Sequence, residues 1–448
     1  MFFDTTNALI YEDNARLVMR VLQEYSEEGW RIPRIMFYTN TASGDTVQRI
    51  YDAIYRRGFC QDTWFILDGK PVIVAKEEEC SPEARAFFNI KVAQWPNEPD
   101  RVGGWPWMDF TRPQRVFPNQ KGEPEVINVS VAQHPQIRFG DSALYGETAN
   151  RGRAYHNGEN DPTPDAWMKG FNFAEQFEHA LSVDPPIVLV TGWNEWIAGV
   201  WGNRTDERPI CFVDCANAEY SRDIEMMRGG YFDNYLMQLL SFVRRYKGAE
   251  ETPTYAPVLS LDMPLSASME ASPARYHSFS DGGFSRHAEG QGGVIYTNYT
   301  QRNVIEEIGV KHDENDLSFT VRTAAPLSDP LGAGSWMKIY LNTEGGTGYE
   351  YVLNHTTCRG GRTTLARVVG TGDDLTAENI DDTPIRYEVE GNLLRLHLPR
   401  AAVGLDHENF TLWFKVADSR ETYTSIEDFY DKGDVTPLGR LNFVYRGR

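Results

Sequence analysis

The chain has 448 residues, of which 41% are hydrophobic and 12% aromatic, a composition typical of a globular protein with two or three domains. Its net charge of −20 argues against binding to nucleic acid or to an anionic membrane surface, since both require a basic patch. The five cysteines are too scattered for a disulfide framework or a zinc site, and no apolar run is long enough for a membrane span.

Strand-like and helix-like segments alternate from the start of the chain to about residue 250. This alternation is typical of βα units and predicts a TIM barrel, the (β/α)8 fold, over residues 1–250. Only seven strands can be counted, and the first begins at residue 1, so we expect that the first βα unit of the barrel precedes Met1. The predicted strands lie at residues 1–7, 32–40, 72–75, 88–94, 105–110, 126–133 and 187–191, and the longest predicted helices at 14–28, 45–57 and 230–246.

The pattern changes after residue 250. Residues 251–273 are rich in Ala, Pro, Ser, Thr and Glu, which predicts a linker. Beyond it, short alternating segments are separated by Gly and Asp turns without helical stretches between them. Residues 274–448 are therefore predicted to form an all-β sandwich.

The most informative segment is the strand that ends in Trp193-Asn194-Glu195-Trp196. In a TIM barrel the catalytic groups lie where the strands end. Glycoside hydrolysis needs two carboxyl groups, one protonated and one ionised. We expect the two indoles to favour the protonated, acidic form of Glu195 by desolvation. Asp109 is the best-placed second carboxyl group and Asp4 the next, although a purely structural loop carboxylate is the alternative for each.

Other polar and aromatic residues follow the predicted strands and are candidates for substrate binding. His134 is favoured as a hydrogen-bond donor to substrate over a metal-binding role with His156 and His179. The charges of residues 220–225 are interpreted as the start of a helix. No serine-hydrolase, dinucleotide, phosphate-loop or zinc-protease motif is present, so no cofactor and no metal are expected. The candidate substrate-binding residues are Asp4, Asn7, Asn40, Trp95, His134, His156, Trp193 and Trp196.

The Trp-Asn-Glu-Trp strand end, with Asp68-Gly69-Lys70-Pro71 before a strand, resembles the barrel glycosidases related to glycoside hydrolase families 71 and 99. Residues 130–135, 150–158 and 220–225 resemble motifs of one bacterial branch of that group. Residues 276–448 resemble, more weakly, a family 9-type carbohydrate-binding module. The resemblance implies a polysaccharide-degrading bacterial enzyme that is periplasmic or secreted, its signal peptide having preceded Met1.

One departure from these families limits what the resemblance implies. The paired-glutamate motif of family 99 is absent, and Asp109 occupies roughly its place. The substrate and mechanism of that family therefore do not carry over. The expected function is hydrolysis of a polysaccharide or oligosaccharide through a carboxylate pair. The alternatives are a non-catalytic glycan-binding protein with a degenerate site, and a C-terminal domain with a purely structural role.

Overall fold

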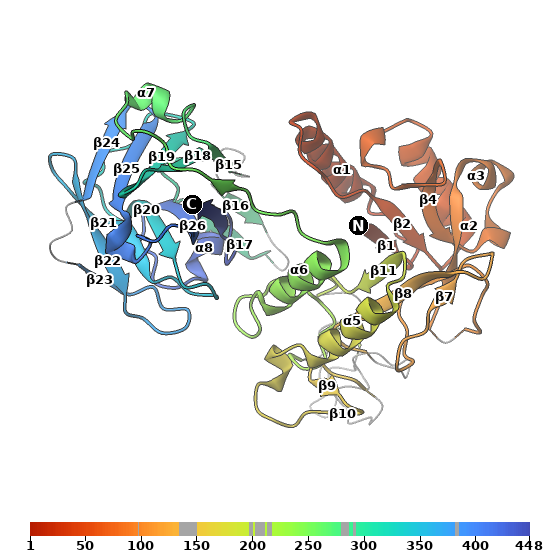
Figure 1. Cartoon of the computed structure of the whole chain (residues 1–448). Helices are drawn as coiled ribbons and strands as arrows, with labels where there is room; N and C mark the ends of the chain where they lie inside the picture. The colour runs from red at the N-terminus through yellow and green to blue at the C-terminus, as the bar shows by residue number, and fades with distance from the viewer. Residues whose placement is uncertain are drawn as a thin grey trace. The chain divides into compact units, whose positions relative to one another are not determined.

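A computed structural model describes residues 1–96, 98–133, 150–196, 200–201, 211–212, 217–278, 286–289, 293–380 and 385–448. The chain divides into two compact units, Met1–Ala249 and Glu250–Arg448 (Figure 1). Each unit has its own hydrophobic core. None of the helices in the described part of the chain combines the length and the apolar character that crossing a bilayer requires.

The N-terminal unit contains two small sheets whose long strands are parallel. In the first sheet the order is β1-β2-β4-β5-β6, with β3 antiparallel to β4. In the second sheet β11 is parallel to β8, and β7 is antiparallel to β8. The strands are β1 (Phe2–Thr5), β2 (Met36–Thr39), β3 (Ile66–Leu67), β4 (Lys70–Ala75), β5 (Asn89–Gln94), β6 (Gly104–Pro106), β7 (Phe117–Pro118), β8 (Pro124–Ser130) and β11 (Ile187–Thr191).

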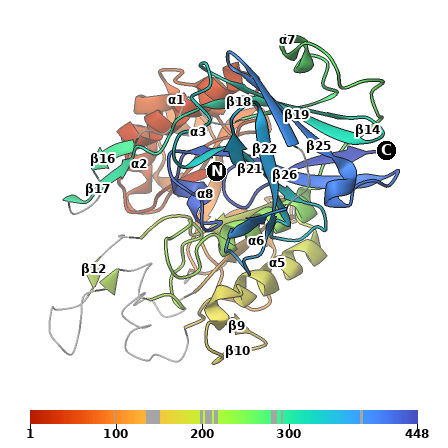
Figure 2. The same cartoon turned by 90° about the vertical axis from the view of Figure 1, so that its left-hand side faces the viewer.

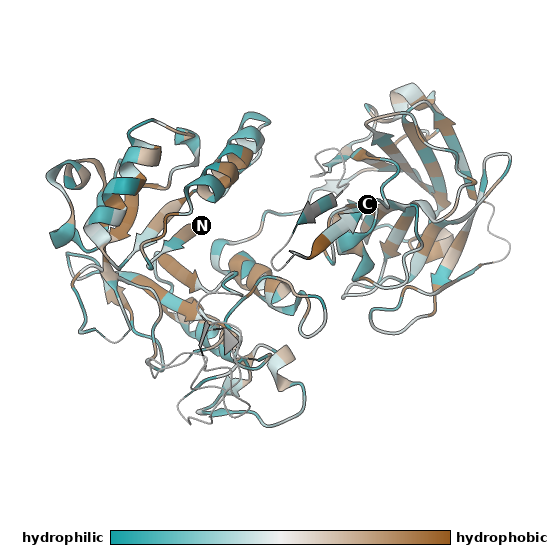
Figure 3. Cartoon of the chain, turned by 180° about the vertical axis from the view of Figure 1, so that it is seen from behind, coloured by the Kyte–Doolittle hydropathy of each residue, from teal (hydrophilic) through white to brown (hydrophobic). Residues whose placement is uncertain are grey.

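Amphipathic helices cover these sheets. Helices α1 (Glu12–Glu27) and α2 (Ser43–Ile50) bury residues such as Met19 and Val47 against Phe37 and Ile73 of the parallel sheet. Helix α3 (Pro82–Phe87) follows β4. Helices α5 (Phe171–Val183) and α6 (Asn234–Lys247) pack against each other and share a core with β8. Figure 3 shows the resulting alternation of apolar and polar residues along α1 and α6.

The prediction of a TIM barrel is wrong. Within the described residues the parallel strands form two separate sheets and not one closed ring. Among the described strands, pairing is missing between β6 and β8 and between β11 and β1. The first of these two breaks has a visible local cause. Strand β6 ends at Pro106, which has no N–H to donate to a neighbouring strand. Instead, the side-chain amide of Asn128 donates to the carbonyls of Pro106 (3.4 Å) and Trp107 (3.2 Å). A side-chain bridge thus replaces a backbone ladder at this position.

The C-terminal unit is built almost entirely of antiparallel strands. Its main sheet has the order β14-β28-β26-β20-β21-β22-β24-β25-β19-β18-β15, and β23 and β27 pair with β22 and β26. Figure 2 shows several of these strands, among them β18, β19 and β25. The strands are β14 (Thr254–Tyr255), β15 (Ala274–His277), β18 (Ile305–His312), β19 (Asp316–Thr323), β20 (Ser335–Asn342), β21 (Tyr351–Cys358), β22 (Arg362–Val368), β23 (Ala377–Asn379), β24 (Ile385–Glu390), β25 (Leu393–Pro399), β26 (Phe410–Ser419), β27 (Asp434–Thr436) and β28 (Phe443–Gly447), beside a separate hairpin of β16 (Arg286–Glu289) and β17 (Ile295–Asn298).

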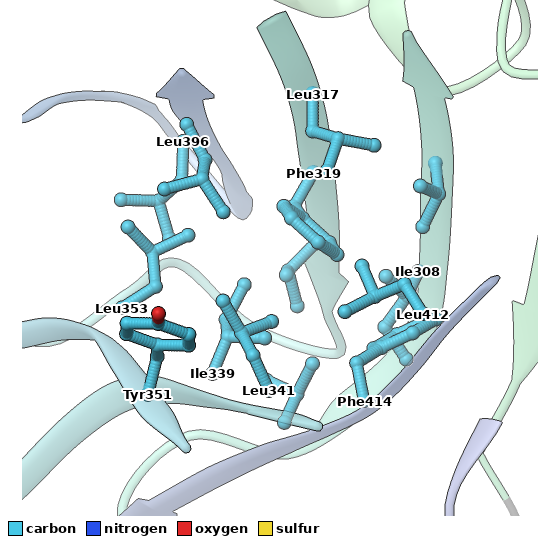
Figure 4. Packing of buried hydrophobic residues seen from close by; sticks show 14 of the residues in the cluster. Ile308, Leu317, Phe319, Ile339, Leu341, Tyr351, Leu353, Leu396, Leu412 and Phe414 are labelled. Carbon is cyan, nitrogen blue, oxygen red and sulfur yellow. The ribbon is translucent and has the colours of Figure 1, made fainter. Parts of the chain in front are cut away.

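The prediction of a sandwich of two sheets is also wrong, because these strands form one continuous, nearly closed sheet. The Tyr276 hydroxyl on β15 donates to the carbonyl of Val444 on β28 at 2.8 Å, and His312 on β18 lies 2.6 Å from the Tyr445 hydroxyl. Irregularities in β20 and β21 help the sheet curve. Apolar side chains such as Phe319 fill the interior (Figure 4).

Residues 251–273, expected to be a linker, contribute to the C-terminal unit. They hold β14 and the short helix α7 (Leu265–Ser268), which packs near β24 and β25. Leu265 and Met269 are buried there. A second short helix, α8 (Asp428–Asp431), precedes β27.

Candidate active site

The end of β11 is held in place by a distant segment of the chain. Gly192 adopts φ +90°, and a Cβ at this position would lie 2.2 Å from the carbonyl oxygen of Arg222. The N–H of Ile224 donates to the carbonyl of Gly192 at 3.1 Å, and the N–H of Glu225 donates to the carbonyl of Trp193 at 2.9 Å. Only glycine permits this close approach, so the strand end and residues 222–225 form one local structure.

Glu195 sits at the junction of these two segments. Its backbone N–H donates to Asp223 Oδ1 at 2.5 Å, and its side chain is partly buried. The two flanking indoles have different environments. Trp193 is 46% exposed, whereas Trp196 donates through Nε1 to Glu225 Oε2 at 2.7 Å. Trp196 therefore anchors the loop, and Trp193 is the indole open to solvent.

Asp4, at the end of β1, is the carboxyl group that the structure brings into electrostatic range of Glu195. Its Oδ2 accepts from Trp107 Nε1 at 2.8 Å, and its Oδ1 accepts from the N–H of Thr6 at 2.9 Å. Burial, and next the negative charge of Glu195, raise the pKa of Asp4 to about 6, although these two hydrogen bonds act in the opposite direction. Asp4 thus holds its proton up to a higher pH than an ordinary aspartate does.

A buried guanidinium lies among the carboxyl groups. Arg222 is 2% exposed, and its Cζ lies 5.3 Å from the centre of the Trp107 ring. Burial lowers the pKa of Arg222, while the charges of Glu195, Asp223 and Asp4 oppose that effect. Burial raises the pKa of Asp223 to about 6, against the hydrogen bond from Glu195 and the charge of Arg222.

A second layer of residues fixes the segment that carries Arg222 and Asp223. Arg153 is fully buried, and its Cζ lies 4.0 Å from the ring centre of Tyr231 and 4.1 Å from that of Tyr235. Its Nη2 donates to Ser221 Oγ at 3.1 Å and to the carbonyl of Asp223. The Tyr231 hydroxyl donates to the same carbonyl at 2.9 Å. These contacts leave the Asp223 backbone little freedom.

Asp109, the expected second carboxyl group, is fully buried and holds the loop after β6. Its Oδ1 accepts from the N–H of Thr111 (3.1 Å) and from Arg115 Nε (3.1 Å) and Nη2 (2.8 Å). Its Oδ2 accepts from the backbone N–H of Arg115 at 2.7 Å. Both oxygens are therefore occupied by donors of its own loop, and the geometry favours Asp4 as the partner of Glu195.

The remaining candidates are dispersed. Trp95 stacks on Trp107, with ring centres 4.6 Å apart, and so lies beside Asp4. Asn40 is partly buried, and its Oδ1 has no hydrogen-bond partner among the described residues. Asn7 is exposed and donates to the Tyr11 hydroxyl at 3.0 Å.

His156 is not joined to this set by any contact within the described residues. His156 lies on the short strand β9 (Tyr155–His156), which pairs with β10 (Glu159–Asn160), and its ring packs against Phe171 at 4.4 Å. His134 lies outside the described residues.

The interpretation of residues 220–225 as a helix start is wrong, and it hid two residues of the site. Helix α6 begins only at Asn234, and residues 221–224 are irregular and buried. The available signal was an arginine next to an aspartate in a segment without helical periodicity, which indicates a buried ion cluster as readily as a helix terminus.

Among the described residues, no group of three His, Cys, Asp or Glu side chains is arranged to hold a metal ion. Comparison of the chain with protein-family models, with curated proteins and with solved structures found no match. The assignment of function therefore depends on the chemistry of the site alone.

Proposed function

We propose that Asp4 and Glu195 form the carboxyl pair of a glycoside hydrolase. Glycosidic bond cleavage needs a protonated carboxyl group to donate to the leaving oxygen and an ionised one as nucleophile or base. The observation that carries the proposal is that burial and the charge of Glu195 raise the pKa of Asp4 to about 6. Two carboxyl groups whose environments separate their proton affinities are the usual arrangement for acid and base roles.

In this proposal Asp4 is the proton donor and Glu195 is the ionised partner. These roles are opposite to those expected from the sequence, where two indoles were expected to desolvate Glu195. Trp196 is hydrogen-bonded to Glu225 and Trp193 is nearly half exposed, whereas burial is the largest influence on the pKa of Asp4. Desolvation thus acts on Asp4.

Aromatic side chains around the pair support a sugar as the substrate. Trp95 stacks on the buried Trp107, and Trp193 exposes much of its ring on the other strand end. Flat aromatic faces with one polar edge suit the mixed apolar and hydroxylated surface of a sugar ring. The substrate class that we propose is therefore an oligosaccharide or polysaccharide.

The test is a hydrolysis screen on soluble oligosaccharides with the wild type and three variants. Glu195→Gln and Asp4→Asn should each lower the rate about 10²–10⁴-fold, since general acid–base catalysis typically contributes that much. The control Asp13→Asn changes an exposed carboxylate on α1 and should leave the rate unchanged. An aryl glycoside with an activated leaving group should restore turnover in Asp4→Asn but not in Glu195→Gln.

Two results would contradict the proposal. Retention of more than about half of the wild-type rate by Glu195→Gln would remove Glu195 from the chemistry. Glycan binding without turnover by the wild type would favour the alternative, a non-catalytic glycan-binding protein.

A further inference from the structure

Two arginines converge on a single amide near the strand ends of the candidate active site. Arg112 Nη2 donates to Gln133 Oε1 at 2.7 Å, and Arg151 Nη1 donates to the same oxygen at 3.3 Å. Arg112 Nη2 also donates to Asn172 Oδ1 at 3.0 Å. These side-chain acceptors are neutral amides, so they orient the two guanidinium groups without cancelling their charge.

Glu175, the carboxylate that pairs with Arg112 in the described part of the chain, compensates the positive charge only in part. Arg112 Nε lies 3.9 Å from Glu175 Oε1 and has no hydrogen-bond partner in the part of the chain that the structure describes. The other oxygen of Glu175 accepts from the N–H of Asn157 at 2.9 Å. Burial and the charge of Arg151 lower the pKa of Arg112 to about 10, so the positive form of Arg112 is disfavoured where it stands.

Arg151 is the more accessible of the two arginines. It is partly exposed, donates to the carbonyl of Phe110 at 2.5 Å and lies 5.3 Å from the centre of the Tyr155 ring. Within the described ranges it forms no ion pair with a carboxylate. Its remaining N–H groups can therefore reach a ligand from solvent.

A continuous set of contacts connects this pair to the proposed carboxyl pair. Gln133 Nε2 donates to the backbone carbonyl of Asp109 at 2.7 Å. Asp109 is two residues beyond Trp107, whose indole holds Asp4. Gln133, which both arginines contact, is therefore joined to the loop after β6 that also carries Trp107.

We propose that Arg112 and Arg151 bind the negatively charged group of an acidic sugar unit in the substrate. The planar guanidinium fork matches two oxygens of a carboxylate or of a sulfate ester, which makes arginine the preferred residue for both groups. An incoming anion would also relieve the repulsion between the two cations. This inference rests on the proposed function and specifies its substrate class as an anionic glycan.

The experiment measures binding by calorimetry with matched trisaccharides of the gluco and galacto series, each in neutral, uronate and sulfated form. The wild type should bind at least one charged form more than tenfold more tightly than its neutral counterpart. Arg151→Gln should remove about tenfold or more of that preference, because hydrogen bonds to charged groups have about this strength. The uronate and sulfate arms decide which anionic group is recognised.

Arg245→Gln is the matched control, since Arg245 is 48% exposed and already pairs with a carboxylate, that of Glu178. It should bind like the wild type. Thermal unfolding of each variant checks that the fold is retained. Arg151→Gln is preferred to Arg112→Gln because Arg112 also ties the loop after β6 to α5.

Equal binding of charged and neutral trisaccharides by the wild type would overturn the inference. So would an Arg151→Gln variant that keeps the wild-type preference for charged trisaccharides. Hydrolysis of neutral glycans that depends on Glu195, without a preference for charged ones, would overturn this inference and leave the proposed function standing. A charge preference that depends on Arg151, without hydrolysis of any glycan, would overturn the proposed function and leave the anion-binding role of the two arginines standing.

Discussion

Each unit of this protein buries arginine beside aspartate, but the two clusters have different chemistry. In the C-terminal unit both oxygens of Asp418 accept from Arg302, at 3.0 and 3.1 Å, and the backbone N–H groups of Asn303 and Met337 complete the set. In the N-terminal unit, Asp223 Oδ2 is buried and has no hydrogen-bond partner among the described residues, and the pKa of Asp4 is raised.

The difference separates a fully paired ion cluster from the cluster that we propose to be functional. Asp418 is fully paired and joins β26 to residues 302–303 and to β20, so its charge contributes to the stability of the sheet. Around Arg222, by contrast, the charges of Glu195, Asp223 and Asp4 are crowded together, and Asp223 Oδ2 lacks a hydrogen-bond partner among the described residues. Crowding of this kind costs stability and is characteristic of sites where a proton is held for chemistry.

The largest effect should follow from breaking the structural cluster. Asp418→Ala leaves Arg302, whose side chain is 6% exposed, without its carboxylate. Removing one partner of a buried pair typically costs about 3–5 kcal/mol. Denaturant unfolding should show this loss of stability in the unfolding transition of the C-terminal unit. A cost below about 1 kcal/mol would mean that Asp418 is not the structural anchor that its contacts indicate.

Gly192→Ala should have the next largest effect. Its Cβ would meet the Arg222 carbonyl, a backbone atom that cannot easily move. Gly158 is a matched control, because it has nearly the same φ (+93°) and a Cβ added there would have no atom within 4 Å. Alanine at either position is strained by the positive φ. We expect Gly192→Ala to lower the free energy of unfolding by about 1–3 kcal/mol more than Gly158→Ala does, which is the usual cost of overpacking. Equal unfolding free energies would show that the two segments are not rigidly joined.

The smallest effect is the pH dependence of the Asp4 site. A carboxyl group with a raised folded-state pKa binds its proton more tightly in the folded than in the unfolded protein. Its contribution to stability is present below about pH 4 and is lost as pH rises to about 6, the pKa of folded Asp4.

Asp4→Asn should therefore be more stable than the wild type at pH 7, by roughly 1–2 kcal/mol after allowing for partial exposure, and equal to it at pH 4. Thermal unfolding at the two pH values measures the difference. A variant that is less stable than the wild type at pH 7 would show that the Asp4 carboxylate is well paired, like Asp418.

Local patterns in the sequence predicted much of the secondary structure. The apolar run of residues 187–191 is β11, and the periodicity of residues 230–246 overlaps α6, because alternation and helical periodicity act over a few residues. Whether the parallel strands close into a ring was not predictable in the same way. Closure depends on lateral pairing between strands that are distant in the sequence, and in the described part of the chain neither β6 with β8 nor β11 with β1 is paired.

The sequence by itself determined that a carboxylate, Glu195, stands at the end of a buried strand between tryptophans. The choice of Asp4 as its proposed partner depends on the tertiary structure. Asp4 and Asp109 both follow strands and look equivalent along the chain. Asp109 accepts hydrogen bonds from Arg115, which is six residues away in the sequence. Asp4 accepts one from Trp107, which is more than a hundred residues away. The proton affinity of a carboxyl group depends on burial and on charges brought together from distant segments, and these follow from the fold and not from local sequence.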